Sequence, residues 1–232
     1  YGVADMSTLK VDPESGKQKP DYRWNDEELT EQVYLNHLIG TQSIGVQPCN
    51  ENSNARFGVV DVDPKNYTNF DKKFFIDIIQ NYNLPLIPIL SKSGGLHLYL
   101  FMSEFVPAVL IRSFLSNLLP LFKLKPDCEI FPKQTQLTKD NETGQLNKGN
   151  FINLPYFKKS ERVAINVDGT AFTFDQFIEV LESNTATPEK LKTITESIEQ
   201  KDLEGVDKEF DDGPPCLAHL SKIMKNPGFD GK

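Results

Sequence analysis

The chain has 232 residues, 38% of them hydrophobic and 16 of them phenylalanine, which is enough for one domain with a substantial core and a small additional segment. No run reaches the ~18 to 20 apolar residues of a membrane span and no signal-peptide pattern occurs, so we expect a cytoplasmic protein with no membrane partner. The net charge of −8 neither supports nor excludes nucleic-acid binding, because residues 179–212 hold 11 acidic residues and 4 lysines while the rest of the chain carries only −1.

The three cysteines, Cys49, Cys128 and Cys216, are odd in number and far apart in the sequence. This pattern argues against a disulfide framework and for a reducing compartment. Cys216 and His219 form a lone C-x-x-H pair, whereas a structural zinc site needs about four ligands. We therefore expect neither disulfides nor zinc to hold the fold.

The first part of the chain contains few clear patterns. Residues 1–28 are polar and rich in Asp, Lys, Pro and Gly, and they predict an irregular lead-in. The apolar spacing over residues 29–39 predicts a helix that ends at Gly40. Residues 43–48 then predict a short strand.

The clearest patterns lie between residues 56 and 131. In chain order, they predict a strand at 56–62, a helix at 71–82, strands at 86–90 and 96–102, a helix at 106–119 and a strand at 129–131. Pro88 favours an edge position for its strand, because proline has no N–H to donate. The order β-α-β-β-α-β is the split βαβ pattern of RRM-like and ferredoxin-like folds.

The last part predicts a short strand at 151–154, a helix at 174–181 and an acidic solvated helix or linker after Asn184. Residues 216–224 predict one more short helix. The expected fold class is therefore α+β: an RRM-like (split βαβ) catalytic sheet with an N-terminal α/β unit over residues 1–185. An acidic linker and the start of a helical segment follow over residues 186–232.

The predicted topology brings three polar motifs together. In a split βαβ sheet, the end of the first strand lies beside the starts of the third and fourth strands, which run antiparallel to it. The residues at these three points are Asp61 and Asp63, Ser93 and His97, and Asp127 and Glu129. Carboxylates held this close repel one another unless a cation lies between them, and hard oxygen ligands select Mg²⁺ or Mn²⁺. A pair of such ions is typical of nucleotidyl or phosphoryl transfer.

The stretch SKSGGLH supplies the groups that such a site needs for phosphate. A Gly-Gly turn is expected to expose backbone N–H groups around Gly94. Lys92, Ser93 and His97 would then help to hold a triphosphate. His97 is accordingly placed at the mouth of its strand, beside the carboxylates.

Each motif alone has a simpler explanation. A D-x-D sequence often just ends a strand, Ser-Gly-Gly is commonly a tight turn, and a lone histidine is commonly a structural hydrogen-bonding group. One alternative keeps the metals and makes the protein a two-metal nuclease or another nucleotidyltransferase. A second is a non-catalytic RRM-like module that stacks single strands on aromatics such as Tyr99 and Phe101.

The motifs VVDVD, SKSGGLHLYLF and CEIFPKQ together resemble the archaeo-eukaryotic primase superfamily, the primase-polymerases. The resemblance is closest to the branch found in phages, plasmids and conflict systems such as TOTE. It extends to SIGVQP before the first motif, to VPAVLIR after the histidine strand, and to GNFINLPYF. It covers residues 42–157, and more loosely continues to residue 181.

The resemblance implies roles for individual residues. Asp61 and Asp63 would bind two ions, Mg²⁺ or Mn²⁺, and align a primer 3′-OH on the α-phosphate. The third acidic ligand would be Glu129, with Asp127 as its competitor. The remaining residues implied are triphosphate contacts at Lys92, Ser93, Gly94 and His97, and nucleotide or template contacts at Lys133, Gln134 and Asn150.

The implied activity is that of a DNA primase-polymerase, which adds nucleotides from dNTPs, or also NTPs, to a primer on a DNA template. Implied partners are template and primer, together with a helicase or other replication proteins, in a phage- or plasmid-encoded prokaryotic setting. Residues 213–224 resemble the entry to a helical domain that is associated with primer synthesis in relatives. The resemblance thus implies primer extension by this domain, and it leaves de novo priming in the full-length protein open.

Overall fold

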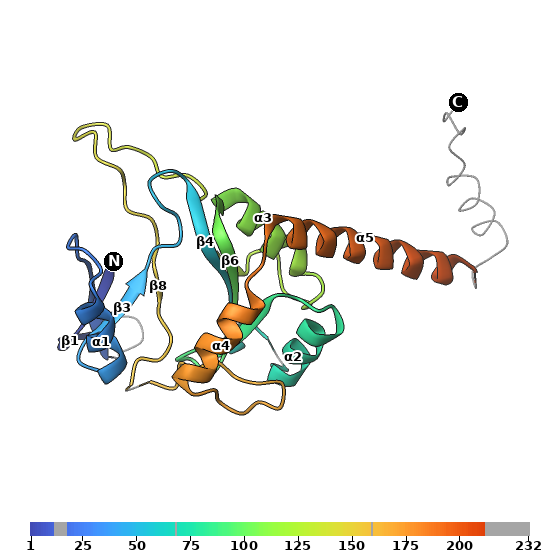
Figure 1. Cartoon of the computed structure of the whole chain (residues 1–232), viewed down its shortest axis with the longest axis horizontal. Coiled ribbons are helices and arrows are strands. Elements are labelled where there is room, and N and C mark those ends of the chain that lie inside the picture. The colour runs from blue at the N-terminus through green and yellow to red at the C-terminus, as the bar shows by residue number, and fades with distance from the viewer. Residues whose placement is uncertain (12–17, 68, 159, 212–232) are drawn as a thin grey trace. The chain divides into compact units, whose positions relative to one another are not determined.

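A computed structural model describes residues 1–11, 18–67, 69–158 and 160–211 (Figure 1). It falls into two compact units, Tyr1–Pro188 and Glu189–Lys232. The acidic segment begins as the helix α5, Pro188–Asp211. The predicted helix at 216–224, with Cys216 and His219, lies outside the described residues. Within the described ranges, no helix is both long enough and apolar enough to cross a membrane.

The central sheet has the predicted split βαβ topology. Its strands lie in the order β5-β6-β4-β7, and every neighbouring pair is antiparallel. The strands are β4 (Asn54–Val62), β5 (Leu86–Leu90), β6 (Leu96–Pro107) and β7 (Glu129–Phe131). Pro88 is on the edge strand β5, as its missing N–H predicts.

Two helices complete this motif, α2 (Lys72–Asn81) and α3 (Ala108–Leu118). Ile111 and Leu115 of α3 are fully buried, and α3 contacts β4, β6 and β7. Gly58 of β4 allows this close approach, because a Cβ at that position would lie 2.3 Å from Cγ2 of Ile111. The helix therefore covers the sheet face to which Gly58 belongs.

The opposite face of the sheet forms a second core. Its buried members come from the sheet, from the segment after β7 and from α4 (Phe174–Asn184), and they are Val59, Ile87, Ile89, Tyr99, Phe131, Ile152, Ala164 and Phe177. The sheet is thus covered in its middle on both faces, as an α+β domain requires.

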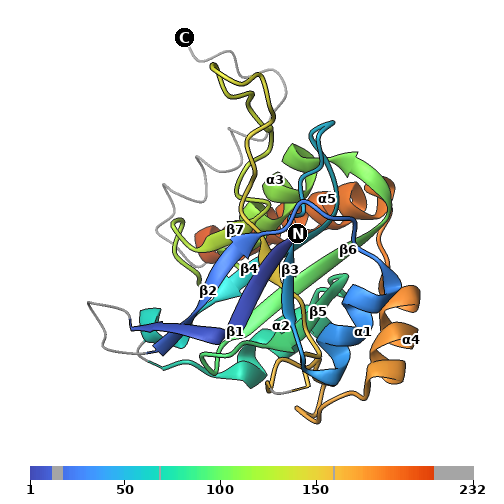
Figure 2. The same ribbon diagram turned by 90° about the vertical axis from the view of Figure 1, so that its left-hand side faces the viewer.

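Residues 1–24 do not form the irregular lead-in that their composition predicts. They form β1 (Gly2–Val11) and β2 (Gln18–Trp24), which pair antiparallel. A second sheet has the order β2-β1-β3-β8, with β3 at Ser43–Val46 and β8 at Ile152–Asn153. Figure 2 shows its strands β2, β1 and β3, and Figure 1 shows β8 beside β3. The prediction was wrong because strand pairing with β3 and the burial of Val3 and Ala4 outweigh a polar composition.

The helix α1, Glu31–Ile39, ends as predicted at Gly40, whose φ is 85°. The predicted helix at 106–119 begins later than expected, because β6 continues to Pro107. Asn54 and Ala55 of β4 pair with Pro107 and Val106, so the ladder hydrogen bonds extend the strand past the expected boundary.

Candidate active site

The end of β4 lies beside the starts of β6 and β7, as the predicted topology requires. Asp61 is opposite His97 on one side and opposite Glu129 on the other. The His97 Nε2 and Asp61 Oδ1 atoms are 3.3 Å apart. Three chemically active residues that are up to 68 positions apart in the sequence are thus direct neighbours in the ladder.

Asp63 lies just beyond the strand and begins a 3-10 helix at Pro64–Asn66. Its carboxylate accepts a hydrogen bond from the Lys65 backbone N–H at 3.2 Å and pairs with Lys65 Nζ at 2.6 Å. Partial burial by itself would raise the pKa of this carboxyl, but the hydrogen bonds and charge of Lys65 outweigh it and lower that pKa. Asp63 is therefore ionised at neutral pH.

These carboxylates line one cavity of about 320 Å³. All four predicted acidic residues contribute to it, and the full lining is Asp61, Asp63, Lys65, Asn66, Tyr67, Lys125, Asp127, Cys128 and Glu129. The sequence analysis missed the other five, which are Lys65, Asn66, Tyr67, Lys125 and Cys128. We call this feature the acidic cavity.

The donor set of the acidic cavity suits a hard divalent cation. In the described ranges of the chain, no three His, Cys, Asp or Glu side chains are grouped closely enough to hold one ion together. Magnesium, however, is usually held by one or two carboxylates, with water and substrate phosphates as its other ligands. Asp61 and Asp63 supply such a pair, and Glu129, the ladder neighbour of Asp61, and Asp127 line the same cavity.

Cys128 and Tyr67 add polar but uncharged groups. The Cys128 thiol lies 3.4 Å from the Asp61 carbonyl oxygen. Burial, reinforced by the nearby carboxylates, raises the pKa of Cys128 to about 11, and burial raises the pKa of Tyr67 to about 12. Both groups stay protonated at neutral pH and add no negative charge. The position of Cys128 between two acidic residues was the sequence signal for its place here.

The SKSGG turn differs in part from the expectation. Gly94 has a φ of 85°, which favours glycine, and Lys92 and Ser93 are exposed beside it. The Gly94 N–H donates to the Ser91 carbonyl, and the Gly95 N–H donates to Ser91 Oγ at 3.0 Å. The expectation of free glycine N–H donors is therefore wrong, because the turn uses them to close itself.

Position 95 requires glycine for a separate structural reason. A Cβ there would lie 2.1 Å from the Val62 carbonyl oxygen and 2.7 Å from Pro64 Cδ. Only glycine lets the start of β6 approach the end of β4 this closely. The second glycine of the turn thus holds His97 in register with Asp61.

The three remaining predicted contacts lie on the segment between β7 and β8. Lys133 pairs with Glu129 at 2.9 Å and lies over the Phe131 ring. Gln134 and Asn150 hydrogen-bond to each other twice, through Gln134 Nε2 and through the Asn150 backbone N–H. None of these three belongs to the lining of the acidic cavity, and Lys133 reaches its edge through Glu129.

The sequence comparison agrees with this geometry. The family model of the archaeo-eukaryotic primase domain of the TOTE conflict system matches residues 13–197, which include every strand of the central sheet and the whole acidic cavity. No curated protein matches the chain. Because the match covers well over half of the chain, this protein belongs to the family of archaeo-eukaryotic primase domains of TOTE conflict systems.

Proposed function

We propose that this domain extends a primer 3′ end on a DNA template by nucleotidyl transfer from dNTPs or NTPs. The family is one of primase-polymerase-like nucleotidyltransferases, which gives the reaction class. The observation that carries the proposal is the register of Asp61 with both His97 and Glu129 at an open cavity lined by four carboxylates.

Asp61 and Asp63 would hold Mg²⁺ or Mn²⁺, with Glu129 as the third ligand and Asp127 as its competitor. Two such ions, when bound, neutralise charge on the reacting phosphate and make the attacking hydroxyl more acidic. The chain itself contributes fixed positions: the β4 ladder holds Asp61, and the 3-10 turn holds Asp63. The rate gain would come from alignment and charge neutralisation.

The triphosphate would lie across the start of β6. The His97 side chain is only 12% exposed, and its Nε2 lies 3.3 Å from Asp61 Oδ1. Asp61 therefore fixes the orientation of the imidazole ring. Lys92 and Ser93 are exposed on the adjoining turn, and Lys65 and Lys125 line the acidic cavity. These donors can bind phosphate oxygens, and Lys133, Gln134 and Asn150 would contact the nucleotide or template from the edge.

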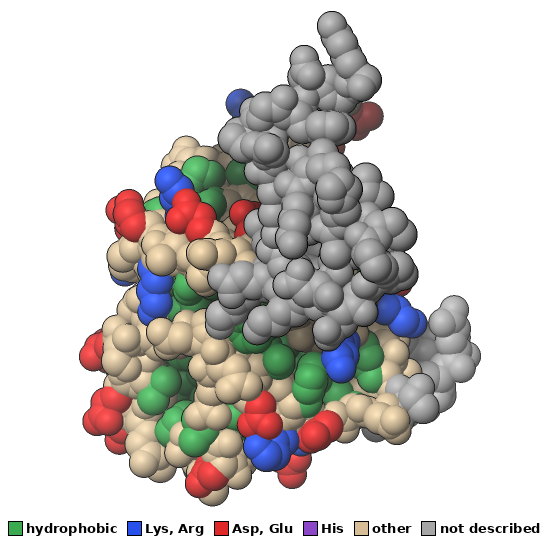
Figure 3. All heavy atoms as spheres, turned by 90° about the vertical axis from the view of Figure 1, so that its right-hand side faces the viewer, with side chains coloured by type: hydrophobic (Ala, Val, Ile, Leu, Met, Phe, Trp, Pro, Cys, Tyr) green, Lys and Arg blue, Asp and Glu red, His purple; other side chains and the backbone are tan. Residues whose placement is uncertain are grey.

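One face of the molecule shows how its described charged side chains are distributed. On the face seen in Figure 3, the described Lys and Arg side chains lie among Asp and Glu side chains rather than in one basic patch. At the acidic cavity, contact with nucleic-acid phosphates would depend on Lys65 and Lys125 of its lining. Three other expectations stay predictions: partnership with a helicase or other replication proteins, a phage or plasmid setting, and separate roles for residues 1–185 and 186–232.

The binding-module alternative fits less well. Stacking of single strands on an RRM-like sheet needs displayed aromatics. Of the two aromatics expected to stack bases, Tyr99 is only 1% exposed and lies against Phe101, with ring centroids 5.5 Å apart, so only Phe101 is partly exposed. A nuclease with the same carboxylates differs from a polymerase in its products, which are shorter rather than longer than the labelled strand.

The test is a primer-extension assay with a labelled primer on a longer template, four dNTPs and Mg²⁺ or Mn²⁺. We compare the wild type with the double variant Asp61→Ala/Asp63→Ala. Glu51→Ala/Glu104→Ala, which removes two exposed carboxylates outside the cavity, is the control. We expect a ladder of longer products from the wild type and the control alone.

Shortened labelled strands in place of longer ones would replace the proposal with a nuclease. Equal extension by the Asp61→Ala/Asp63→Ala variant would remove the site. DNA binding by the wild type and by the Asp61→Ala/Asp63→Ala variant, without extension by either, would favour the binding module.

A further inference from the structure

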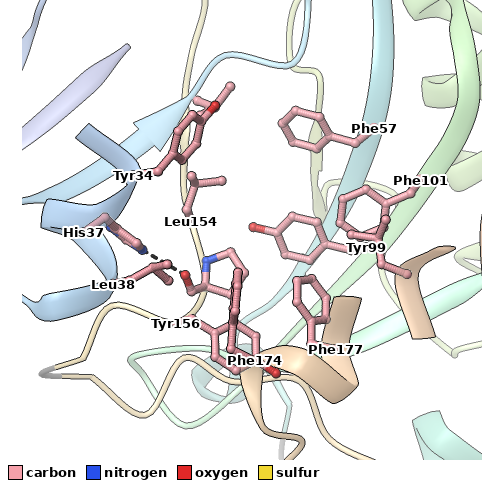
Figure 4. A pocket seen from close by; sticks show the side chains of 13 residues that line it. Tyr34, His37, Leu38, Phe57, Tyr99, Phe101, Leu154, Tyr156, Phe174 and Phe177 are labelled. Carbon is pink, nitrogen blue, oxygen red and sulfur yellow. Dashed lines mark hydrogen bonds between the residues drawn. The ribbon is translucent and has the colours of Figure 1, made fainter. Parts of the chain in front are cut away.

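An apolar cavity of the first unit lies toward the other end of the β4–β6 ladder. Its volume is about 380 Å³, and its floor consists of Phe57, Tyr99 and Phe101 (Figure 4). The three rings form a close group: the Phe57 and Phe101 centroids are 6.3 Å apart, and each ring is nearly parallel to Tyr99. We call this feature the aromatic groove.

Two helices form its walls. Tyr34 and Leu38 come from α1, and Phe174, Phe177 and Leu181 come from α4. These positions follow helical spacing, so each helix turns one apolar face to the groove. Residues 154–156 also line the groove, which is thus bounded by two helix faces, this segment and the aromatic floor.

The polar atoms of the groove already have partners. His37 Nε2 lies 2.8 Å from the Pro155 carbonyl, and its Nδ1 accepts from the Ile44 N–H. The Tyr99 hydroxyl donates to the Asn153 carbonyl at 3.3 Å. Burial also lowers the pKa of His37, so this ring is neutral. The groove thus offers apolar contact rather than cations or a hydrogen-bonding code.

The margins of the groove are apolar and unusually exposed. Of its lining, Tyr34 is 42% exposed and Phe174 is 41% exposed, while Leu35 and Ile39, outside the lining but on the same helix α1, are both 47% exposed. Large exposed apolar side chains that cluster in one place are typical of an interaction surface, whereas an ordinary protein surface exposes them singly. A ligand in the groove would remove this area from water.

The charge around the groove selects the ligand. Residues 25–41 and 163–187, which contain α1 and α4, hold eight Asp and Glu residues and no Lys or Arg, and one of the eight, Asp26, is paired with Lys148. All eight acidic residues are exposed. Glu31 lies one turn before Tyr34 and Leu35, and Glu182 lies in the same row of α4 as Phe174, so both flank the apolar faces. Nucleic-acid phosphates would be repelled here, whereas Lys and Arg side chains would be attracted.

We propose that the aromatic groove binds a basic amphipathic helix of a partner protein. Its apolar face would bury side chains on Phe57 and Phe101, and its Lys or Arg residues would lie against the acidic margins of α1 and α4. This is the helix-in-groove mode of recognition. The site is separate from the acidic cavity, and the proposal does not depend on the polymerase activity.

The probe is a fluorescein-labelled 18-residue peptide of Leu and Lys in which the leucines follow helical spacing. One comparison peptide replaces every Lys with Glu, and another has the Leu/Lys sequence scrambled so that no apolar face forms. We expect the Leu/Lys helix to bind the full chain with a Kd of about 10 µM, and both comparison peptides to bind at least about tenfold more weakly.

Variants of the chain test whether the Leu/Lys peptide binds in the aromatic groove. Tyr34→Ser/Phe174→Ser should weaken binding of the Leu/Lys peptide about tenfold or more, because it removes two exposed aromatic contacts. The control, Phe105→Ser/Val109→Ser, removes two exposed apolar residues outside the groove and should leave Kd unchanged. Glu31→Lys/Glu182→Lys keeps the apolar faces and should weaken binding about fivefold, with circular dichroism confirming that each variant folds.

Three results would overturn the proposal. Equal binding of the Leu/Glu helix would show that charge does not select the partner. Competition between an oligothymidine and the Leu/Lys peptide, lost in Tyr34→Ser/Phe174→Ser, would make the groove a nucleic-acid site. A concentration-dependent dimer abolished by the same variant would make a second copy of this chain the occupant.

Discussion

The two ends of the β4–β6 ladder are built from the same pair of strands but differ in chemistry. At one end, Asp61 is opposite His97; four residues back along β4, Phe57 is opposite Phe101. The rise of about 3.3 Å per strand residue separates the two pairs by about 13 Å. Between them, Val59 and Tyr99 are almost completely buried.

The difference indicates how the face is divided. At the acidic end, side chains stay partly exposed and are held by lysines, turns and ladder register, so they contribute little buried apolar area. At the aromatic end, rings pack on α4 and contribute stability. We therefore expect substitutions at the acidic end to change activity, alone or together with stability, and substitutions in the core of the aromatic end to change stability.

The largest effect is expected from Phe177→Ala at the aromatic end. Phe177 is 5% exposed and packs on Tyr156 and Phe101, with ring centroids 5.0 and 6.3 Å apart. Its loss should lower the free energy of unfolding by about 3 kcal/mol, as for other buried phenylalanines. Urea denaturation measures this. Phe174→Ala, on the same helix but exposed, should cost less than about 1 kcal/mol; equal losses would show that the core does not depend on this ring.

The next effect tests the acidic end. Gly95→Ala should lower the free energy of unfolding by about 2 kcal/mol and also reduce primer extension, because the new Cβ displaces the Val62 carbonyl between Asp61 and Asp63. Gly94→Ala is the control: no atom lies within 4 Å of its Cβ position, so it should cost about 1 kcal/mol of backbone strain and leave extension nearly intact. Normal extension by Gly95→Ala would contradict the role of this close approach.

Much of the acidic end could be predicted because strand order follows from element order. Once residues 56–131 are assigned a β-α-β-β-α-β pattern, the neighbours of Asp61 are fixed by topology rather than by details of packing. The same register pairs Phe57 with Phe101, so part of the aromatic groove was also present in the sequence. Its walls were not, because α1 and α4 reach it only through tertiary packing.

Other features depend on contacts that local patterns do not contain. The hairpin of β1 and β2 owes its strands to pairing with β3, and its polar composition hides this. The closure of the SKSGG turn by Ser91 could not be foreseen either, since a turn signal does not say which donors the turn uses. Topology was thus easier to predict than the hydrogen-bond partners within it.

A smaller effect is expected from His97→Ala. Loss of its ring should raise the KM for dNTP about tenfold, which corresponds to one charge-assisted hydrogen bond to phosphate, and change kcat less. Steady-state extension with varied dNTP measures both constants. Lys92→Ala should raise KM by a smaller factor, because this exposed lysine is screened by solvent. An unchanged KM in His97→Ala would remove the phosphate role of the histidine.

The smallest effect concerns His37 on the wall of the aromatic groove. Its neutral ring bonds both the Pro155 carbonyl and the Ile44 N–H, and a proton on Nδ1 would break the second of these bonds. Burial lowers the pKa of His37 in the folded state, so below about pH 6.5 the unfolded chain binds more protons and stability falls as the pH falls. The loss should be about 1 kcal/mol, the net worth of one hydrogen bond.

Urea denaturation between pH 8 and pH 5 measures this dependence on His37. In His37→Gln, whose amide both donates and accepts without titrating, the fall below about pH 6.5 should be smaller than in the wild type. An identical fall in both proteins would assign the acid sensitivity to other groups. With His37 uncharged, the α1 wall of the groove is stable at neutral pH. An apolar groove with acidic margins requires this, because a cation inside the groove would weaken the apolar contact that distinguishes this end of the sheet from the other.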